Sequence, residues 1–125
     1  MREILELIPG TLEFDNNLLK KNLNKNLTKS IKEKEDLIKE LEEDLECIVC
    51  METSKAPIYC CQEQHLVCSD CRPRIRQTGQ CPSCRVRYPG GELLRHRAAE
   101  RTAVRLGTIR EELRNLNIEL ENNLS

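Results

Sequence analysis

Three features of the sequence predict a small α+β fold that is stabilised by bound metal and flanked by a helical arm on each side. All eight cysteines of the 125-residue chain lie between positions 47 and 84. The chain has no Trp, one Phe and two Tyr, and 33% of it is charged, so the side chains cannot supply a large hydrophobic core. Apolar residues recur at helical spacing before and after the cysteine-rich segment.

The cysteine density indicates either disulfide bonds or bound metal. The first ten residues, MREILELIPG, lack the basic start and apolar run of a signal peptide. We therefore expect a reducing compartment, the cytosol or the nucleus, and thiols that bind metal. No stretch approaches the roughly 20 apolar residues of a membrane span, so no membrane association is expected.

Composition divides the chain into three parts. Residues 1–46 are expected to form a helical or coiled-coil arm whose start is partly disordered, and residues 47–88 form the cysteine-rich module. The breaker Pro89-Gly90-Gly91 then separates the module from an amphipathic helix expected over residues 92–122. All eight lysines lie at or before Lys55, whereas eleven of the twelve arginines follow it.

The N-terminal arm shows its clearest helical signal after residue 30. Ser30 and Glu33 form an S-x-x-E capping box, which predicts that a helix begins or is re-stabilised there. Five asparagines between positions 16 and 26 lower the helix propensity upstream. The apolar stripe of this arm consists of Leu27, Ile31, Ile38, Leu41 and Leu45, with Lys34 as its polar member.

The C-terminal arm carries a heptad pattern with alternating spacings of three and four residues. Its stripe consists of Ala99, Thr102, Leu106, Ile109, Leu113, Leu116 and Leu120. Such a narrow stripe favours pairing with a partner helix, most simply in a homodimer, over packing against the module of the same chain. Both arrangements are compatible with the sequence.

The central motif consists of three Cys-x2-Cys pairs and one Cys-x3-His pair. Two thiolates of a Cys-x2-Cys turn can reach one zinc ion, at about 2.3 Å each. Cys60 and Cys61 are alternatives for one ligand position, and we choose Cys61, which leaves three residues before His65 and makes Cys60 the surplus thiol. Eight donors make two closed four-ligand sites, which are structural because no position is open for a reactive water. The candidate ligands are Cys47, Cys50, Cys61, His65, Cys68, Cys71, Cys81 and Cys84.

This C3HC4 order resembles that of the RING fingers, and the run from His65 to Pro73 is most similar to the seven-in-absentia ubiquitin ligases. The resemblance implies a cross-braced fold with two structural zinc ions. It implies two ligand sets, in which the first zinc is bound by Cys47, Cys50, Cys68 and Cys71, and the second by Cys61, His65, Cys81 and Cys84.

The resemblance also implies an activity. RING ligases bind a ubiquitin-charged conjugating enzyme (E2) and favour its closed, reactive conformation, so that ubiquitin passes to a substrate lysine. Ile48, Ile75 and Pro82 match the apolar positions that contact the E2, and we expect them to form a shallow exposed patch. Arg85 matches the cationic position that bridges E2 and ubiquitin, a task that suits the fork of guanidinium donors.

Two other functions remain compatible with the residues. One is a zinc-dependent interaction or dimerisation module without ligase activity. The other is nucleic-acid binding through the basic loops, which the scarcity of aromatic residues for base stacking disfavours. The arginines that suggest it are Arg72, Arg74, Arg76, Arg85 and Arg87.

Overall fold

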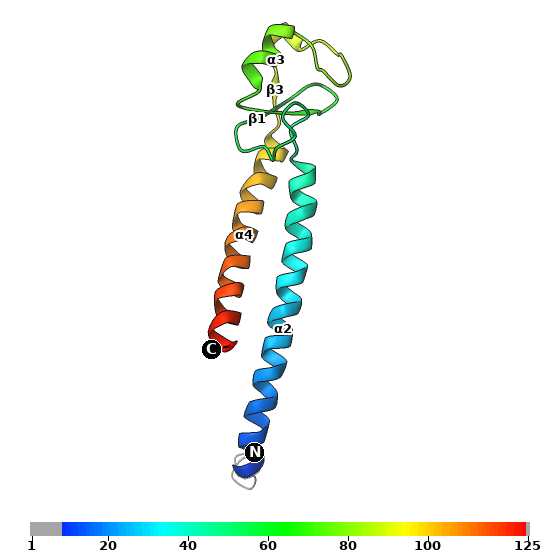
Figure 1. Ribbon diagram of the computed structural model, residues 1–125. Coiled ribbons are helices and arrows are strands. Elements are labelled where there is room, and N and C mark those ends of the chain that lie inside the picture. The colour runs from blue at the N-terminus through cyan, green and yellow to red at the C-terminus, as the bar shows by residue number, and fades with distance from the viewer. Residues whose placement is uncertain (1–8, 125) are drawn as a thin grey trace. The chain divides into compact units, whose positions relative to one another are not determined.

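The computed structural model describes the backbone of residues 9–124 and side chains from residue 18 onwards. The disorder expected at the start of the N-terminal arm concerns residues outside this range. Two long helices flank the central part of the chain, which contains the cysteine-rich module with a short helix and two short strands, and a third short strand that follows the module (Figure 1). The elements are α2 (Pro9–Asp44), β1 (Ile58–Cys60), β2 (Leu66–Cys68), α3 (Arg72–Thr78), a 3-10 turn (Pro89–Gly91), β3 (Leu94–Arg95) and α4 (Arg97–Leu124).

Helix α2 runs without interruption over 36 residues. The capping box at Ser30 and Glu33 therefore lies inside the helix, and no new helix begins there. The asparagine cluster also lies within α2, because propensity differences of a few tenths of a kcal/mol per residue do not break a helix. After the helix ends, Glu46 forms an isolated antiparallel bridge with Thr53 and leads the chain into the first pair of cysteines.

Helix α4 begins at Arg97 and not at residue 92 as the sequence predicted, because the intervening residues form β3 and a helix cap. The Nδ1 atom of His96 accepts a hydrogen bond from the backbone N–H of Ala99 at 3.0 Å. This imidazole thus satisfies one of the N–H groups that have no partner within the helix. A histidine is an unusual cap, which explains why the sequence signals for a helix start did not locate it.

The sheet is antiparallel with the strand order β2-β1-β3. Strand β1 lies at the centre, where Tyr59 is opposite Val67 on one side and Arg95 on the other. Strands of two or three residues are shorter than the usual five or so, so the sheet alone buries little surface. Its stability must come from metal binding and from the helices.

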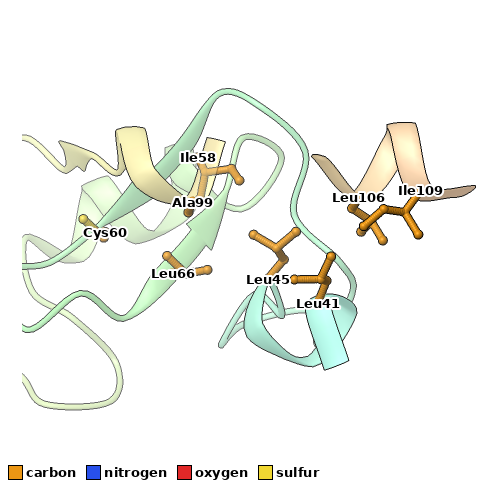
Figure 2. Close-up of a cluster of buried hydrophobic side chains, with 8 residues drawn as sticks. All are labelled: Leu41, Leu45, Ile58, Cys60, Leu66, Ala99, Leu106 and Ile109. Atoms are coloured by element: carbon orange, nitrogen blue, oxygen red, sulfur yellow. The ribbon is translucent and has the colours of Figure 1, made fainter. Parts of the chain in front are cut away.

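The chain divides into two compact units, one of which comprises residues 36–110. In this unit the end of α2, the start of α4 and the sheet share one hydrophobic cluster (Figure 2). The cluster consists of Leu41, Leu45, Ile58, Cys60, Leu66, Ala99, Leu106 and Ile109. Here both stripes pack against the module of their own chain, which is the arrangement that the heptad spacing had disfavoured.

The second unit contains the part of α2 before residue 36 and the part of α4 after residue 110. Leu27 and Ile31 of the predicted stripe are buried there, and Leu113 and Leu116 are half-buried. Lys34, the polar member of the stripe, donates to Glu112 at 2.7 Å. Between Pro9 and Leu124, neither long helix has an apolar run sufficient to cross a membrane.

Candidate metal centre

The eight predicted ligands gather into two groups of four. Within each group all ligand atoms lie within 4.8 Å of one another. One group is Cys47, Cys50, Cys68 and Cys71, and the other is Cys61, His65, Cys81 and Cys84. The groups alternate along the chain, so each loop between successive pairs spans from one site to the other. These are the ligand sets of a cross-braced fold.

The interatomic distances in both groups fit a tetrahedral zinc ion. Ligands at about 2.3 Å (sulfur) and about 2.0 Å (nitrogen) from zinc place two sulfurs about 3.8 Å apart, and a sulfur and a nitrogen about 3.5 Å apart. The Sγ atoms of Cys50 and Cys68 lie 3.8 Å apart, and those of Cys61 and Cys84 lie 3.7 Å apart. The Nδ1 atom of His65 lies 3.3 Å from the sulfur of Cys61 and 3.6 Å from that of Cys81.

Both terminal cysteine pairs form the same backbone turn. The N–H of Met51 donates to the carbonyl of Cys47 at 2.9 Å, and the N–H of Arg85 donates to the carbonyl of Cys81 at 2.8 Å. In each turn a second backbone N–H donates to the sulfur of the first cysteine at 3.4 Å. Val49 donates to Cys47, and Ser83 donates to Cys81. Met51 and Arg85 close these turns with φ of 65° and 61°, the left-handed region that glycine occupies most easily.

Despite burial, backbone hydrogen bonds lower the pKa of the first cysteine in each terminal pair, Cys47 and Cys81. Burial by itself would raise the pKa of Cys47, but backbone N–H groups of Cys50, Cys68 and Val49 donate to its sulfur, and the pKa falls to about 7. Burial and neighbouring thiols raise the pKa of Cys71 to about 12. Because zinc binds thiolates, the hydrogen bonds that lower the pKa of Cys47 would favour metal binding, whereas the burial and neighbouring thiols that raise the pKa of Cys71 would oppose it.

The chemistry of the donor sets points to zinc with a structural role. Four sulfurs, or three sulfurs and one imidazole, in tetrahedral arrangement are typical of structural zinc sites. When bound, the two ions would cross-link segments that the small sheet could not hold together. Each site would use all four of its donors, so a bound metal would leave no position for a substrate.

Cys60 lies outside both metal groups. Its side chain is 4% exposed and belongs to the hydrophobic cluster shared with α2 and α4 (Figure 2). Burial, and then the neighbouring thiol of Cys61, raise its pKa. The alternation of side chains along β1 explains the difference between the two neighbours, because Cys60 ends the strand facing the helices and Cys61 turns towards the metal.

Of the three predicted E2-contacting residues, the structure exposes one. Pro82 is exposed and Ile48 is half-buried, but Ile75 is only 6% exposed. Ile75 packs within a second hydrophobic cluster that surrounds the metal groups and includes Val67 and Tyr88. The prediction of an exposed patch is therefore wrong for Ile75, since α3 directs this side chain into the module.

The basic residues of the module fall into two kinds. Arg72 lies over the ring of Tyr59, 4.5 Å from its centroid, and also pairs with Glu92. Arg76 pairs with Glu92 as well. In contrast, Arg85 is exposed and forms no ion pair with any described residue. Internal pairing thus removes part of the basic surface that suggested nucleic-acid binding.

Glu92 and Tyr59 were not singled out by the sequence, although they hold two of the module's arginines. No motif marks them, because their role depends on contacts between segments more than ten residues apart.

Comparison with known proteins matches the metal-binding region to an established family. Residues 47–84 match the model for the RING finger of E3 ubiquitin-protein ligase sina/sinah. The chain is 44% identical over 41 residues to E3 ubiquitin-protein ligase DIS1 of Oryza sativa subsp. japonica, which is 33% of this chain and 13% of that protein. It is 45% identical over 40 residues to E3 ubiquitin-protein ligase sina of Schistosoma mansoni, which is 32% of this chain and 10% of that protein.

A longer match extends into the flanking residues. The chain is 40% identical over 57 residues to putative E3 ubiquitin-protein ligase SINA-like 6 of Arabidopsis thaliana, which is 46% of this chain and 18% of that protein. The matched segment thus covers less than a fifth of each of these relatives. The ligand order, the two interleaved metal groups and these matches agree, and the segment from Cys47 to Cys84 is a RING finger of the seven-in-absentia type.

Proposed function

We propose that this chain is a RING-type E3 ubiquitin ligase that binds a ubiquitin-charged E2 and promotes transfer of ubiquitin to a lysine of a substrate protein. The observation that carries the proposal is the sina-type RING finger with both ligand sets complete. The relatives that share this segment are named ubiquitin ligases. Such a role requires reduced thiols, which is consistent with the cytosol or the nucleus.

The E2 is proposed to bind at the two cysteine turns. Ile48 lies within the first turn and Pro82 within the second, and both have solvent-accessible side chains. Ile75 supports this surface from within, through its packing in the cluster around the metal groups. The surface depends on both zinc ions, because each turn is held by a different site.

Arg85 is proposed to bridge the E2 and ubiquitin. It follows the last zinc ligand, its side chain is exposed, and its backbone is fixed by the hydrogen bond to Cys81. A guanidinium held in this way can donate to acceptors on two surfaces at once. It would favour one conformer of the flexible E2-ubiquitin conjugate and would not react with it.

The direct test is discharge of ubiquitin from a panel of charged E2 enzymes, measured with the zinc-loaded full chain. We expect at least one E2 to be accelerated, and the variants Ile48→Ala and Arg85→Ala to reduce that acceleration by about tenfold or more, equivalent to about 1.4 kcal/mol of transition-state stabilisation. Arg87→Ala is the matched control, because Arg87 is also exposed and lies two residues after Arg85, but it does not directly follow the last zinc ligand. Full zinc content without acceleration of any E2 would favour the non-catalytic interaction module.

We further propose that the chain forms a homodimer through α2. Leu18, Leu19 and Leu23 are 49%, 57% and 55% exposed, and Leu19 and Leu23 are one helical turn apart. A second copy would bury this apolar surface. Sedimentation should show a dimer that dissociates in Leu19→Lys and Leu23→Lys but not in the control Lys25→Glu, and a monomer at tens of micromolar for the unmodified chain would exclude it.

A further inference from the structure

A cavity of about 240 Å³ lies between the loop of residues 53–56, which belongs to the RING finger, and one flank of α4. Its apolar lining consists of Ala56, Ala103, Val104 and Leu106, and Val104 is 68% exposed. The loop is anchored by the N–H of Ser54, which donates to the carbonyl of Leu45 at 2.8 Å. The cavity is therefore part of the ordered unit of residues 36–110.

Ser54 supplies an unused hydrogen-bonding group at this cavity. Its side chain is 2% exposed, and its hydroxyl has no hydrogen-bond partner among the described residues. A buried hydroxyl without a partner destabilises a fold by roughly 1–3 kcal/mol. Buried side-chain atoms of Asn24, Arg72 and Tyr88 also lack a partner among the described residues, but of these four residues only Ser54 lines the cavity. The hydroxyl oxygen is itself buried, so a ligand that draws it into the cavity and accepts its hydrogen bond would remove the penalty.

The charges that line the cavity are all positive. Lys55 is exposed and forms no ion pair with any described residue. Arg110 pairs with Glu42 at 2.5 Å, so its charge is already compensated. Lys55 thus remains available to an acidic ligand.

The adjoining surface of α4 is open. Gly107 follows Ala103 by one helical turn, and a Cβ atom added at Gly107 would meet nothing within 4 Å. A glycine inside a helix costs about 1 kcal/mol relative to alanine, and no packing contact among the described residues requires it. The absence of a side chain leaves room for the backbone of another chain to approach α4.

We propose that this groove binds an acidic peptide segment of a partner protein, with a small apolar side chain in the cavity and a carboxylate held by Lys55 and the Ser54 hydroxyl. The volume favours such a ligand, because pockets for cofactors and drug-sized molecules are usually about 300–1,000 Å³. That the bound partner is a substrate of the ligase rests on the function proposed above. The binding itself does not.

The test uses the zinc-loaded full chain and two fluorescein-labelled probe peptides, Glu-Asp-Val-Glu-Asp and its uncharged analogue Gln-Asn-Val-Gln-Asn. In fluorescence anisotropy the acidic peptide should bind about tenfold more tightly than the analogue. The variants Lys55→Glu and Val104→Glu should each weaken its binding by about tenfold, whereas the control Lys39→Glu, an exposed lysine of the same unit outside the cavity, should leave it unchanged.

Two further variants separate a binding role from a structural one. Gly107→Leu should obstruct the groove while raising the thermal midpoint, because leucine favours the helix and has free space there. Ser54→Ala should weaken peptide binding without lowering the thermal midpoint. Equal binding of both peptides, or equal losses in Lys55→Glu and Lys39→Glu, would overturn the proposal.

The result is independent of ligase activity. None of these variants alters Ile48, Pro82, Arg85 or a zinc ligand, so E2 discharge in the absence of peptide should stay at the level of the unmodified chain. Absence of E2 discharge together with peptide binding would reject the ligase and retain the groove. E2 discharge without peptide binding would retain the ligase and reject the groove.

Discussion

Glu100, in the first turn of α4, accepts a hydrogen bond from the backbone N–H of Ile58 in β1, with 2.9 Å between Oε2 and N. The same carboxylate pairs with Arg95 of β3, through distances of 2.6 and 2.8 Å. One side chain thus joins the helix to two strands of the sheet. The hydrogen bond from Arg95, and then that from Ile58, lower the pKa of Glu100 to about 2.

We predict that Glu100→Gln lowers the thermal midpoint at pH 7. The folded-state pKa lies below the ordinary value of 4.5, so the ionised carboxylate stabilises the fold above pH 4.5, and this contribution is lost as the pH falls towards 2. The difference between the two proteins should therefore shrink in that window. Zinc occupancy is followed in parallel with a metal indicator, and Glu111→Gln, an exposed position of α4, is the control. An equal midpoint for both proteins at pH 7 would contradict the prediction.

His96→Ala should destabilise the unit of residues 36–110 by about 1 kcal/mol, because the N–H of Ala99 loses its cap at the start of α4. His96→Asn should retain most of the stability, since asparagine is a good capping residue. Urea denaturation followed by circular dichroism measures both. Similar losses in the two variants would show that the imidazole acts through packing and not through the hydrogen bond.

The neighbouring cysteines 60 and 61 should respond oppositely to substitution. Cys61→Ser removes a ligand of the second site, so the bound zinc should fall from two ions to about one per chain. Cys60→Ala should keep both ions and lose about 1 kcal/mol of stability, because Cys60 is a buried apolar contact. Metal release by a thiol reagent, read with a chromogenic chelator, gives the zinc count. Loss of zinc in Cys60→Ala would reverse the assignment.

Leu106→Ala should reduce the free energy of unfolding by about 2–5 kcal/mol, because Leu106 is 2% exposed in the cluster that joins both helices to the sheet. Val104→Ala, two residues away and 68% exposed, should change it by less than about 0.5 kcal/mol. Chemical denaturation of the zinc-loaded protein compares the pair. Equal effects would mean that α4 does not pack on the RING finger through this face.

Arg85→Gly should have opposite effects on stability and on the proposed activity. Glycine relieves the left-handed backbone at φ 61°, which we expect to raise the stability by about 1 kcal/mol. The same change removes the guanidinium, so E2 discharge should fall about tenfold, as in Arg85→Ala. Thermal denaturation and the discharge assay are performed on one preparation. A variant that is both more stable and fully active would exclude Arg85 from the bridging role.

The metal sites were predictable from the sequence to the level of single residues. Ligand spacing is a local property, because two thiolates reach one ion only across a short turn. The three Cys-x2-Cys pairs and the Cys-x3-His pair can therefore be recognised from their spacing. Helix content was predictable for the same reason, since it follows from periodicity within a few turns. The boundaries were less so: α4 begins at Arg97 because His96 caps it, which no common capping signal indicates.

The spacing of the sequence by itself determined the ligand pairs and the presence of long helices on both sides, and its resemblance to the RING family implied how the pairs combine into two ligand sets. Only the tertiary structure decided what those helices contact. The same heptad stripe can pack against a partner helix or against the chain's own sheet. Within residues 36–110, Leu41, Leu45 and Leu106 pack in one cluster with the sheet. Likewise Ile75 is buried, and the 53–56 loop forms a groove against α4. Burial depends on which distant segments meet, and periodicity does not contain that information.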